Sequence, residues 1–163
     1  MTQELADKKV AVLLTDGFEQ VEMTWPRRAL EAAGPTVHLI SPQSDQVQGW
    51  NHFEKADYFS VDVPLDQANA SSYDGLLLPG GVANPDQLRT QPKAVQFIQG
   101  FSQAGKPIAA ICHGPWTLIE ANLVKGRKLT SWPSLKLEHG LGCFLTDRMP
   151  ALQAWHLIWI NVP

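Results

Sequence analysis

Short apolar runs that end in turn residues recur along this chain, and they constrain its fold more than any other feature. The runs cover residues 9–15, 73–78 and 106–112, and segments with helical patterning separate them. Runs that are almost continuously apolar are typical of strands buried on both faces of a parallel sheet. Strands that alternate with helices imply that helices cover both faces of that sheet. The sequence therefore predicts an α/β fold with a mainly parallel sheet.

The spacing of apolar residues predicts the helices between these strands. One helix is expected over residues 19–33, ended by Gly34, because glycine readily adopts the left-handed conformation that follows many helices. Pro26 is tolerated only near a first turn, so we expect this helix to begin effectively close to it. The other expected elements are a helix around residues 94–101 ended by Gly105, a helix around residues 116–123, strands over residues 36–40 and 127–131, and short antiparallel strands or a long excursion over residues 43–72.

Length and composition indicate a single domain over residues 1–163. Hydrophobic residues make up 44% of the chain and charged residues 18%, which argues against disorder. A formal charge of −3 gives no electrostatic reason to expect nucleic-acid or membrane binding. No stretch is long and apolar enough to span a bilayer, and no signal peptide is recognised. Two cysteines, Cys112 and Cys143, make no disulfide framework, so we expect a reducing cytoplasm.

Cys112 lies where an apolar run meets a helical pattern. A strand that delivers a cysteine to the first turn of a helix aims its sulfur at unpaired backbone N–H groups and at the positive end of the helix dipole. Both favour the thiolate, which is the nucleophilic form. Gly114 allows a sharp turn there, as in the elbow that presents serine in hydrolases. The alternative is a structural cysteine, since free cysteine is among the most buried residue types.

Three segments with reactive or flexible residues follow the expected strands. They are residues 16–19, the pair Gly80-Gly81, and the pair Cys112-His113. In open α/β folds, ligands bind beyond the carboxyl ends of the strands. We therefore expect these three segments to meet at one edge of the sheet and to form the functional site.

The residues of these segments suit acyl transfer or aldehyde addition at sulfur. Such chemistry needs a nucleophile, a proton acceptor and hydrogen-bond donors for the developing oxyanion. Cys112 is the candidate nucleophile and Glu19 the candidate proton shuttle, while the backbone N–H groups of Gly81 and His113 are candidate donors. Simpler interpretations remain open: Glu19 as an acid favoured at a helix start, and Gly80-Gly81 as a tight turn.

Charge arguments predict how these groups share protons. We expect Glu19 to be protonated near neutral pH and to donate a hydrogen bond to the Cys112 thiolate, because two adjacent negative charges repel. Side chains adjacent in sequence at a sharp turn often point apart, so we expect an acid from elsewhere to orient His113. Asp86 is a candidate, with a solvated helix-start residue as the alternative. The histidines show no spacing that indicates a metal site, and no organic cofactor is implied.

Residues 110–115, 78–81 and 15–22 resemble the three signatures of the PfpI family of intracellular cysteine proteases and deglycases. That family belongs to the class I glutamine-amidotransferase-like superfamily, alongside the parkinsonism-associated deglycase. Residues 126–133 also match the later strand and turn of the family. The resemblance covers residues 8–136, and residues 137–163 are shorter than the corresponding part of the family and atypical.

The resemblance implies a flavodoxin-like sandwich of three layers with a shortened C-terminal part, assembled as a homodimer or higher oligomer. In some members an acid from the neighbouring subunit completes the environment of the histidine, and Asp86 lies near that position. The candidate site therefore consists of Cys112, His113 and Glu19 as catalytic residues, Gly80, Gly81 and Gly114 as backbone residues around the oxyanion, and Asp86 as a further acid.

Members of the family are described as proteases, deglycases of aldehyde-modified proteins and nucleotides, glyoxalases and stress chaperones. We expect a cysteine-dependent stress-response hydrolase, either protease or deglycase, that acts in the cytoplasm on small aldehyde adducts or peptides. The alternative is a non-enzymatic redox sensor or chaperone-like protein that uses the same cysteine. A third possibility, a glutamine-amidotransferase half, would need a synthase partner and a late histidine–glutamate pair that this sequence lacks.

Overall fold

A six-stranded sheet forms the centre of the computed structural model, which describes residues 5–129, 144–145 and 157–160. The strand order is β11-β8-β7-β1-β3-β6, and every pairing is parallel except that of β11 with β8. The strands are β1 (Lys9–Leu13), β3 (Thr36–Ser41), β6 (Val63–Pro64), β7 (Gly75–Leu78), β8 (Ile108–Ile111) and β11 (Leu157–Ile160). The predicted mainly parallel sheet is confirmed.

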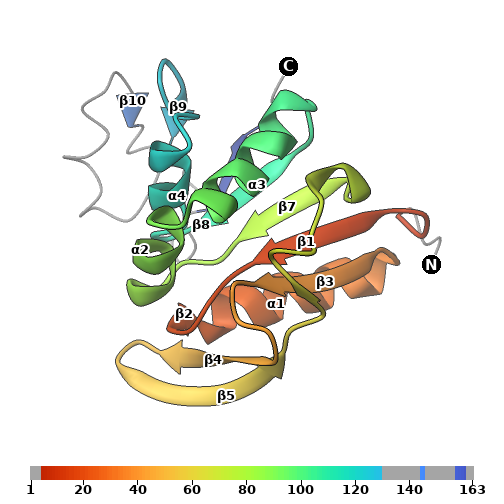
Figure 1. Ribbon diagram of the computed structural model, residues 1–163, viewed down its shortest axis with the longest axis vertical. Helices are drawn as coiled ribbons and strands as arrows, with labels where there is room; N and C mark the ends of the chain where they lie inside the picture. The colour runs from red at the N-terminus through yellow and green to blue at the C-terminus, as the bar shows by residue number, and fades with distance from the viewer. Residues whose placement is uncertain (1–4, 130–143, 146–156, 161–163) are drawn as a thin grey trace.

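Helices cover both faces of this sheet, as predicted (Figure 1). The helix α1 (Gln20–Ala33) packs on one face, while α2 (Ala83–Arg89), α3 (Pro92–Gln103) and α4 (Pro115–Glu120) pack on the other. Strand β1 supplies both cores, because successive side chains of a strand point to opposite faces. Ala11 and Leu13 face α3, whereas Val12 faces α1. The fold is therefore an α/β sandwich of three layers of the flavodoxin-like kind.

The helix α1 begins earlier than Pro26 led us to expect. It starts at Gln20, so Pro26 lies inside it rather than in its first turn. A proline there removes one backbone N–H from the helical hydrogen bonds, and packing of Met23 and Leu30 against the sheet offsets that loss. Gly34 ends the helix with a positive φ of 104°, as predicted.

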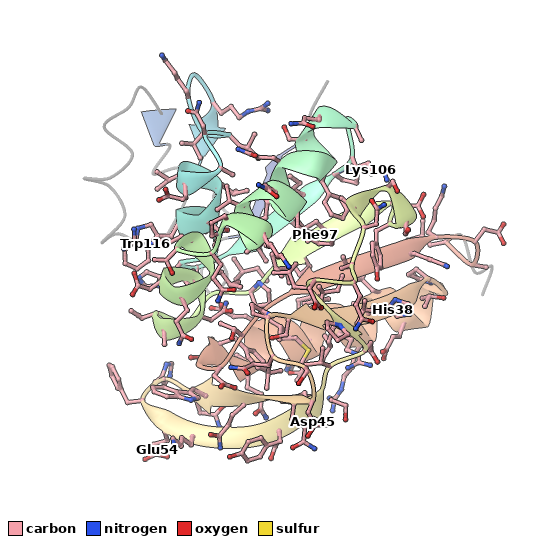
Figure 2. All side chains as sticks on the ribbon, in the orientation of Figure 1. His38, Asp45, Glu54, Phe97, Lys106 and Trp116 are labelled. Atoms are coloured by element: carbon pink, nitrogen blue, oxygen red, sulfur yellow. The ribbon has the colours of Figure 1, made fainter. Side chains whose placement is uncertain are left out.

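Helix α3 confirms the predicted amphipathic pattern, and α2 was not predicted. Ala94, Phe97 and Phe101 of α3 are all buried against the sheet, and Figure 2 shows Phe97 between α3 and the strands. Helix α2 follows the Gly80-Gly81 pair and carries Asp86 in its first turn, which agrees with the alternative of a helix-start acid.

A small second sheet projects beside the N-terminal end of α1. It consists of β2 (Phe18–Glu19), β4 (Gln46–Asn51) and β5 (Glu54–Ser60), in the order β2-β4-β5. The antiparallel pairing of β4 with β5 confirms the short strands predicted within residues 43–72. Gln20 fixes this arm to α1, because its amide exchanges two hydrogen bonds with Asp57, of 2.8 and 2.9 Å. In Figure 2, Glu54 marks the end of the arm at the turn between β4 and β5, and Asp45 marks the opposite end, before β4.

The C-terminal part of the chain is described only in pieces. Strand β9 (Lys128–Leu129) lies within the strand predicted over residues 127–131, and it pairs with β10 (Phe144–Leu145). Strand β11 adds an antiparallel edge to β8. Cys143 and most of residues 137–163 lie outside the described residues. Among the helices that the structure describes, none is long and apolar enough to cross a membrane.

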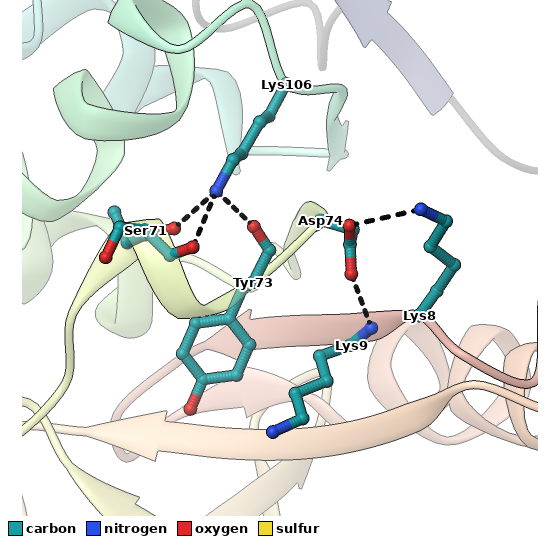
Figure 3. A network of polar contacts seen from close by, with 7 residues as sticks. Lys8, Lys9, Ser71, Tyr73, Asp74 and Lys106 are labelled. Atoms are coloured by element: carbon teal, nitrogen blue, oxygen red, sulfur yellow. Dashed lines mark hydrogen bonds and ion pairs between the residues drawn. The ribbon is translucent and has the colours of Figure 1, made fainter.

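Lys106 connects the loop before β7 to the loop before β8. It lies at the amino end of β8, whereas Cys112 lies at the carboxyl end. Its Nζ donates to the backbone carbonyl oxygens of Ala70, Ser71 and Tyr73 (Figure 3). Ala70 and Ser71 belong to the short 3-10 helix η1 (Ala70–Ser72). These carbonyl oxygens accept hydrogen bonds from a charged amine instead of from water. The contact therefore stabilises the segment that leads into β7.

Replacing Lys106 with Met keeps much of the side-chain volume but removes all three hydrogen bonds. We expect the free energy of unfolding to fall by about 1–3 kcal/mol, the usual range for hydrogen bonds that involve a charged group. Urea unfolding at neutral pH measures this, with Lys125→Met at an exposed lysine as the matched control. Equal unfolding free energies for the two variants would contradict this role of Lys106.

Candidate active site

Cys112 occupies a left-handed turn between β8 and α4. Its φ is +57°, a value that non-glycine residues rarely adopt and that is concentrated at functional sites. The N–H of Gly114 donates to the carbonyl of Ile111 at 2.7 Å and closes the turn. A Cβ at Gly114 would collide with the carbonyl oxygen of Leu78, so only glycine fits there. The predicted strand–turn–helix elbow is confirmed, and Gly114 serves it by its lack of a side chain.

The carboxyl that contacts Cys112 belongs to Glu22, not to Glu19. Glu22 lies in the first turn of α1, is 6% exposed, and forms a hydrogen bond with Cys112. Its Oε2 also accepts from the N–H of Gly80 at 2.8 Å. Glu19 is the residue that precedes the helix, and its Oε2 accepts from the N–H of His52 on the arm at 3.0 Å. The expected contact between Glu19 and Cys112 is therefore corrected to Glu22.

A signal for Glu22 was present in the sequence. Glu22, Pro26 and Leu30 are spaced four residues apart, so they lie along one stripe of α1. An acid on a stripe that is otherwise apolar faces the protein interior and needs a partner there. Glu19 is nearer to the turn in the sequence, but it precedes the helix.

The pair Gly80-Gly81 brings backbone donors to both reactive side chains. The N–H of Gly80 donates to Glu22, and the N–H groups of Gly81 and His113 bond to the sulfur of Cys112. A Cβ at Gly80 would lie 2.7 Å from the Cβ of Cys112 and 2.7 Å from Oε2 of Glu22. Glycine is therefore required at this position for the acid and the thiol to meet.

Burial, rather than the backbone donors, dominates the electrostatics of the pair. Burial raises the pKa of Glu22 to about 7, against the lowering effect of the hydrogen bonds from Gly80 and Cys112. Burial, together with the charge of Glu22, raises the pKa of Cys112 to about 12. The backbone N–H groups of Gly81 and His113 lower the thiol pKa, as expected of the elbow, but burial and Glu22 outweigh them, so the expectation of a low thiol pKa is wrong. Two interacting groups titrate as a unit, so the pair holds one shared proton between these two values.

His113 lies against the sulfur of its neighbour, contrary to expectation. Its Nδ1 is 3.2 Å from Sγ of Cys112, and its side chain is buried. Burial lowers the pKa of His113, so the imidazole is neutral at neutral pH.

Asp86 lies in α2, where its carboxylate pairs with the guanidinium of Arg89 at 2.8 Å. Arg89 in turn lies over the ring of Trp116 at 4.4 Å and links α2 to α4.

Asn84 is a buried polar residue that the sequence analysis did not single out. Its side chain is fully buried, and its Oδ1 accepts from the N–H of Thr15 at 2.8 Å. Its Nδ2 donates to the carbonyls of Pro79 and Gly80, at 2.9 and 3.1 Å. Asparagine is common in loops, so nothing in the sequence distinguished it. Among the described residues, no group of three or more His, Cys, Asp or Glu side chains could hold a metal ion.

Comparisons with known proteins show the family and the fold to which this chain is similar. The family model described as "DJ-1/PfpI family" matches residues 8–147. The chain is 41% identical over 124 residues to protein/nucleic acid deglycase 2 of Escherichia coli, covering 76% of this chain and 70% of that protein. It is 35% identical over 161 residues to deglycase PH1704 of Pyrococcus horikoshii, covering 90% and 94%. The crystal structure of Drosophila melanogaster DJ-1beta superposes with a TM-score of 0.76 at 25% identity, covering 91% of this chain and 76% of that chain.

The raised pKa of Glu22 makes a prediction about stability against pH. The usual pKa of 4.5 applies in the unfolded chain and about 7 in the folded one, so burial of this acid costs nothing below pH 4.5. Stability is then lost as the pH rises through about 7, because the folded state resists ionisation. Glu22→Gln cannot ionise. We expect it to gain about 2–3 kcal/mol of stability relative to the wild type between pH 4.5 and mildly alkaline pH, most of it before the pH reaches about 7.

Urea unfolding at a series of pH values measures this difference. Glu54→Gln, at an exposed acid of β5, controls for the loss of one negative charge. Wild-type and Glu22→Gln curves that run parallel over the whole pH range would contradict a raised pKa at Glu22.

Proposed function

This chain belongs to the DJ-1/PfpI family, and on that premise we propose that it is a cysteine-dependent hydrolase with Cys112 as its nucleophile. The substrates that we infer are aldehyde-damaged proteins or metabolites, or peptides. This inference follows the names of its relatives, two of which are called deglycases. A homodimer or higher oligomer in the cytoplasm forms part of the proposal.

The hydrogen bond between Glu22 and Cys112 carries this proposal. A thiol with a pKa of about 12 does not ionise by itself at neutral pH, so it needs a base in contact with it. Glu22 is that base, and its pKa of about 7 is near the best value for a proton acceptor at neutral pH. Transfer of the shared proton from sulfur to Glu22 moves the negative charge from the carboxylate to the sulfur. The total charge of the pair stays the same. Burial therefore opposes this step far less than it opposes ionisation of an isolated thiol.

The same groups suffice for the bond changes of acyl transfer. The thiolate attacks the substrate carbonyl, an S–C bond forms, and the carbonyl electron pair moves onto oxygen. The N–H groups of Gly81 and His113, which bond to the sulfur, are the nearest donors for that oxygen. Glu22 then returns its proton to the leaving amine as the C–N bond breaks, and water hydrolyses the thioester. The neutral imidazole of His113, 3.2 Å from Sγ, is placed to orient the thiolate or the attacking water.

Substitution of Cys112 and Glu22 tests this function. With a methylglyoxal-modified peptide as substrate, we expect Cys112→Ser to abolish turnover while the fold is retained. Glu22→Gln keeps the shape but accepts no proton, so its rate should fall by about 100-fold or more. Glu19→Gln, three residues earlier in the chain, should retain most of the rate. Product release followed by chromatography, with circular dichroism as the folding check, measures all three proteins. Full turnover by Cys112→Ser would overturn the proposal.

A non-enzymatic redox sensor is the competing outcome of the same experiment. It would show no turnover of adducts or peptides by the wild type, together with selective, reversible oxidation of Cys112 after mild peroxide treatment. Intact-mass measurement detects that oxidation.

A further inference from the structure

We propose that Asn84 is a positioning residue, whose side-chain amide orients the two backbone N–H groups that serve Glu22 and Cys112. The amide donates to two consecutive carbonyls, those of Pro79 and Gly80. The N–H groups that follow these carbonyls belong to Gly80 and Gly81, and they bond to Glu22 and Cys112 respectively. The meaning of this role for catalysis rests on the function proposed above, whereas the geometry and its test do not.

The planarity of the peptide bond explains how one side chain aims two donors. The carbonyl of Pro79 and the N–H of Gly80 lie in one peptide unit, and the carbonyl of Gly80 and the N–H of Gly81 lie in the next. In a trans peptide unit the C=O and N–H bonds point in opposite directions. Because Asn84 holds both carbonyls on its own side, both N–H groups must point to the other side, where Glu22 and Cys112 lie.

A glycine pair needs such a restraint more than other residues do. Glycine has no Cβ, so many backbone conformations are open to it, and Gly81 adopts a φ of +76°. Larger residues would restrict the backbone, but a Cβ at Gly80 would collide with Glu22 and Cys112. The site therefore excludes the side chains that would stiffen this segment. The amide of Asn84 supplies the missing restraint from outside the segment.

The environment of Asn84 makes this restraint firm. Its side chain is fully buried, so no water competes for the two carbonyls. Its Oδ1 accepts from the N–H of Thr15 at 2.8 Å, which ties the amide to the end of β1. The backbone N–H of Glu19 also donates to the carbonyl of Gly80, but at 3.4 Å, longer than the 3.1 Å bond from Asn84. One side chain thus joins the ends of β1 and β7 to the start of α2.

Replacing Asn84 with Ala tests the role, with Leu88→Ala as the matched control. Leu88 is a buried residue of the same helix, so its truncation loosens α2 without removing a bond to Pro79 or Gly80. We expect amide hydrogen exchange at Gly80 and Gly81 to accelerate by about tenfold or more in Asn84→Ala, beyond any change in Leu88→Ala. The pH midpoint of the Glu22 carboxyl carbon, followed by 13C NMR, should rise by about one unit, because the anion of the pair loses a well-aligned donor.

Asn84→Asp keeps the test decisive if the alanine variant does not fold. Aspartate has nearly the same shape and still accepts from Thr15, but an ionised carboxylate faces both carbonyls with oxygen instead of N–H groups. We expect the same acceleration of exchange at Gly80 and Gly81, measured by NMR. Exchange rates at these two amides and a Glu22 titration midpoint equal to those of Leu88→Ala, in either folded variant, would overturn the proposal. A wild type without turnover would count against the proposed hydrolase alone, since neither measurement uses a substrate.

Discussion

The close approach of Gly80 to both Cys112 and Glu22 is the constraint on which the reactive end of this sheet depends. A single added Cβ would lie 2.7 Å from each of them. Because no side chain occupies that position, the buried carboxyl of α1 and the partly buried thiol of the elbow after β8 can meet. Burial then penalises each additional charge in the pair, so the two groups share one proton. The chemistry follows from this packing rather than from an unusually acidic thiol.

The three-layer fold explains why Glu22 reaches the sulfur. Cys112 packs against the core on the α1 face of the sheet, the same cluster that contains Met23 of α1. Helix α4 follows Cys112 on the opposite face, so the left-handed turn at Cys112 is where the chain crosses from one layer to the other. The carboxyl ends of β1, β7 and β8 bring the remaining donors to this crossing. In a parallel sheet with helices on both faces, the residues that follow neighbouring strands lie close together as a consequence of the fold.

Elements with a long apolar pattern can be predicted from this sequence. Features that depend on the geometry of a single turn cannot. The strands β7 and β8 are buried over their length, β1 is buried from Ala11 to Leu13, and α3 is buried along one face, so their patterns are unambiguous. Helix α2 was missed because Pro85 and several polar residues leave its seven residues without a clear apolar stripe. Choosing Glu19 over Glu22 was an error of one helical turn, because the exact start of α1 sets which acid points inward. The low thiol pKa was wrong because the degree of burial cannot be read from neighbouring residues.

Simultaneous titration of the two partners tests the shared proton most directly. In protein labelled with 13C at glutamate side chains and at cysteine Cβ, NMR follows the carboxyl carbon of Glu22 and the Cβ of Cys112 through one pH series. We predict an inflection near pH 7 at both nuclei, because the pair loses its first proton as a unit. The Glu22 inflection should shift when Cys112 is replaced by Ser. A Glu22 carboxyl that ionises at the ordinary pKa of 4.5, with no response at Cys112, would contradict a shared proton.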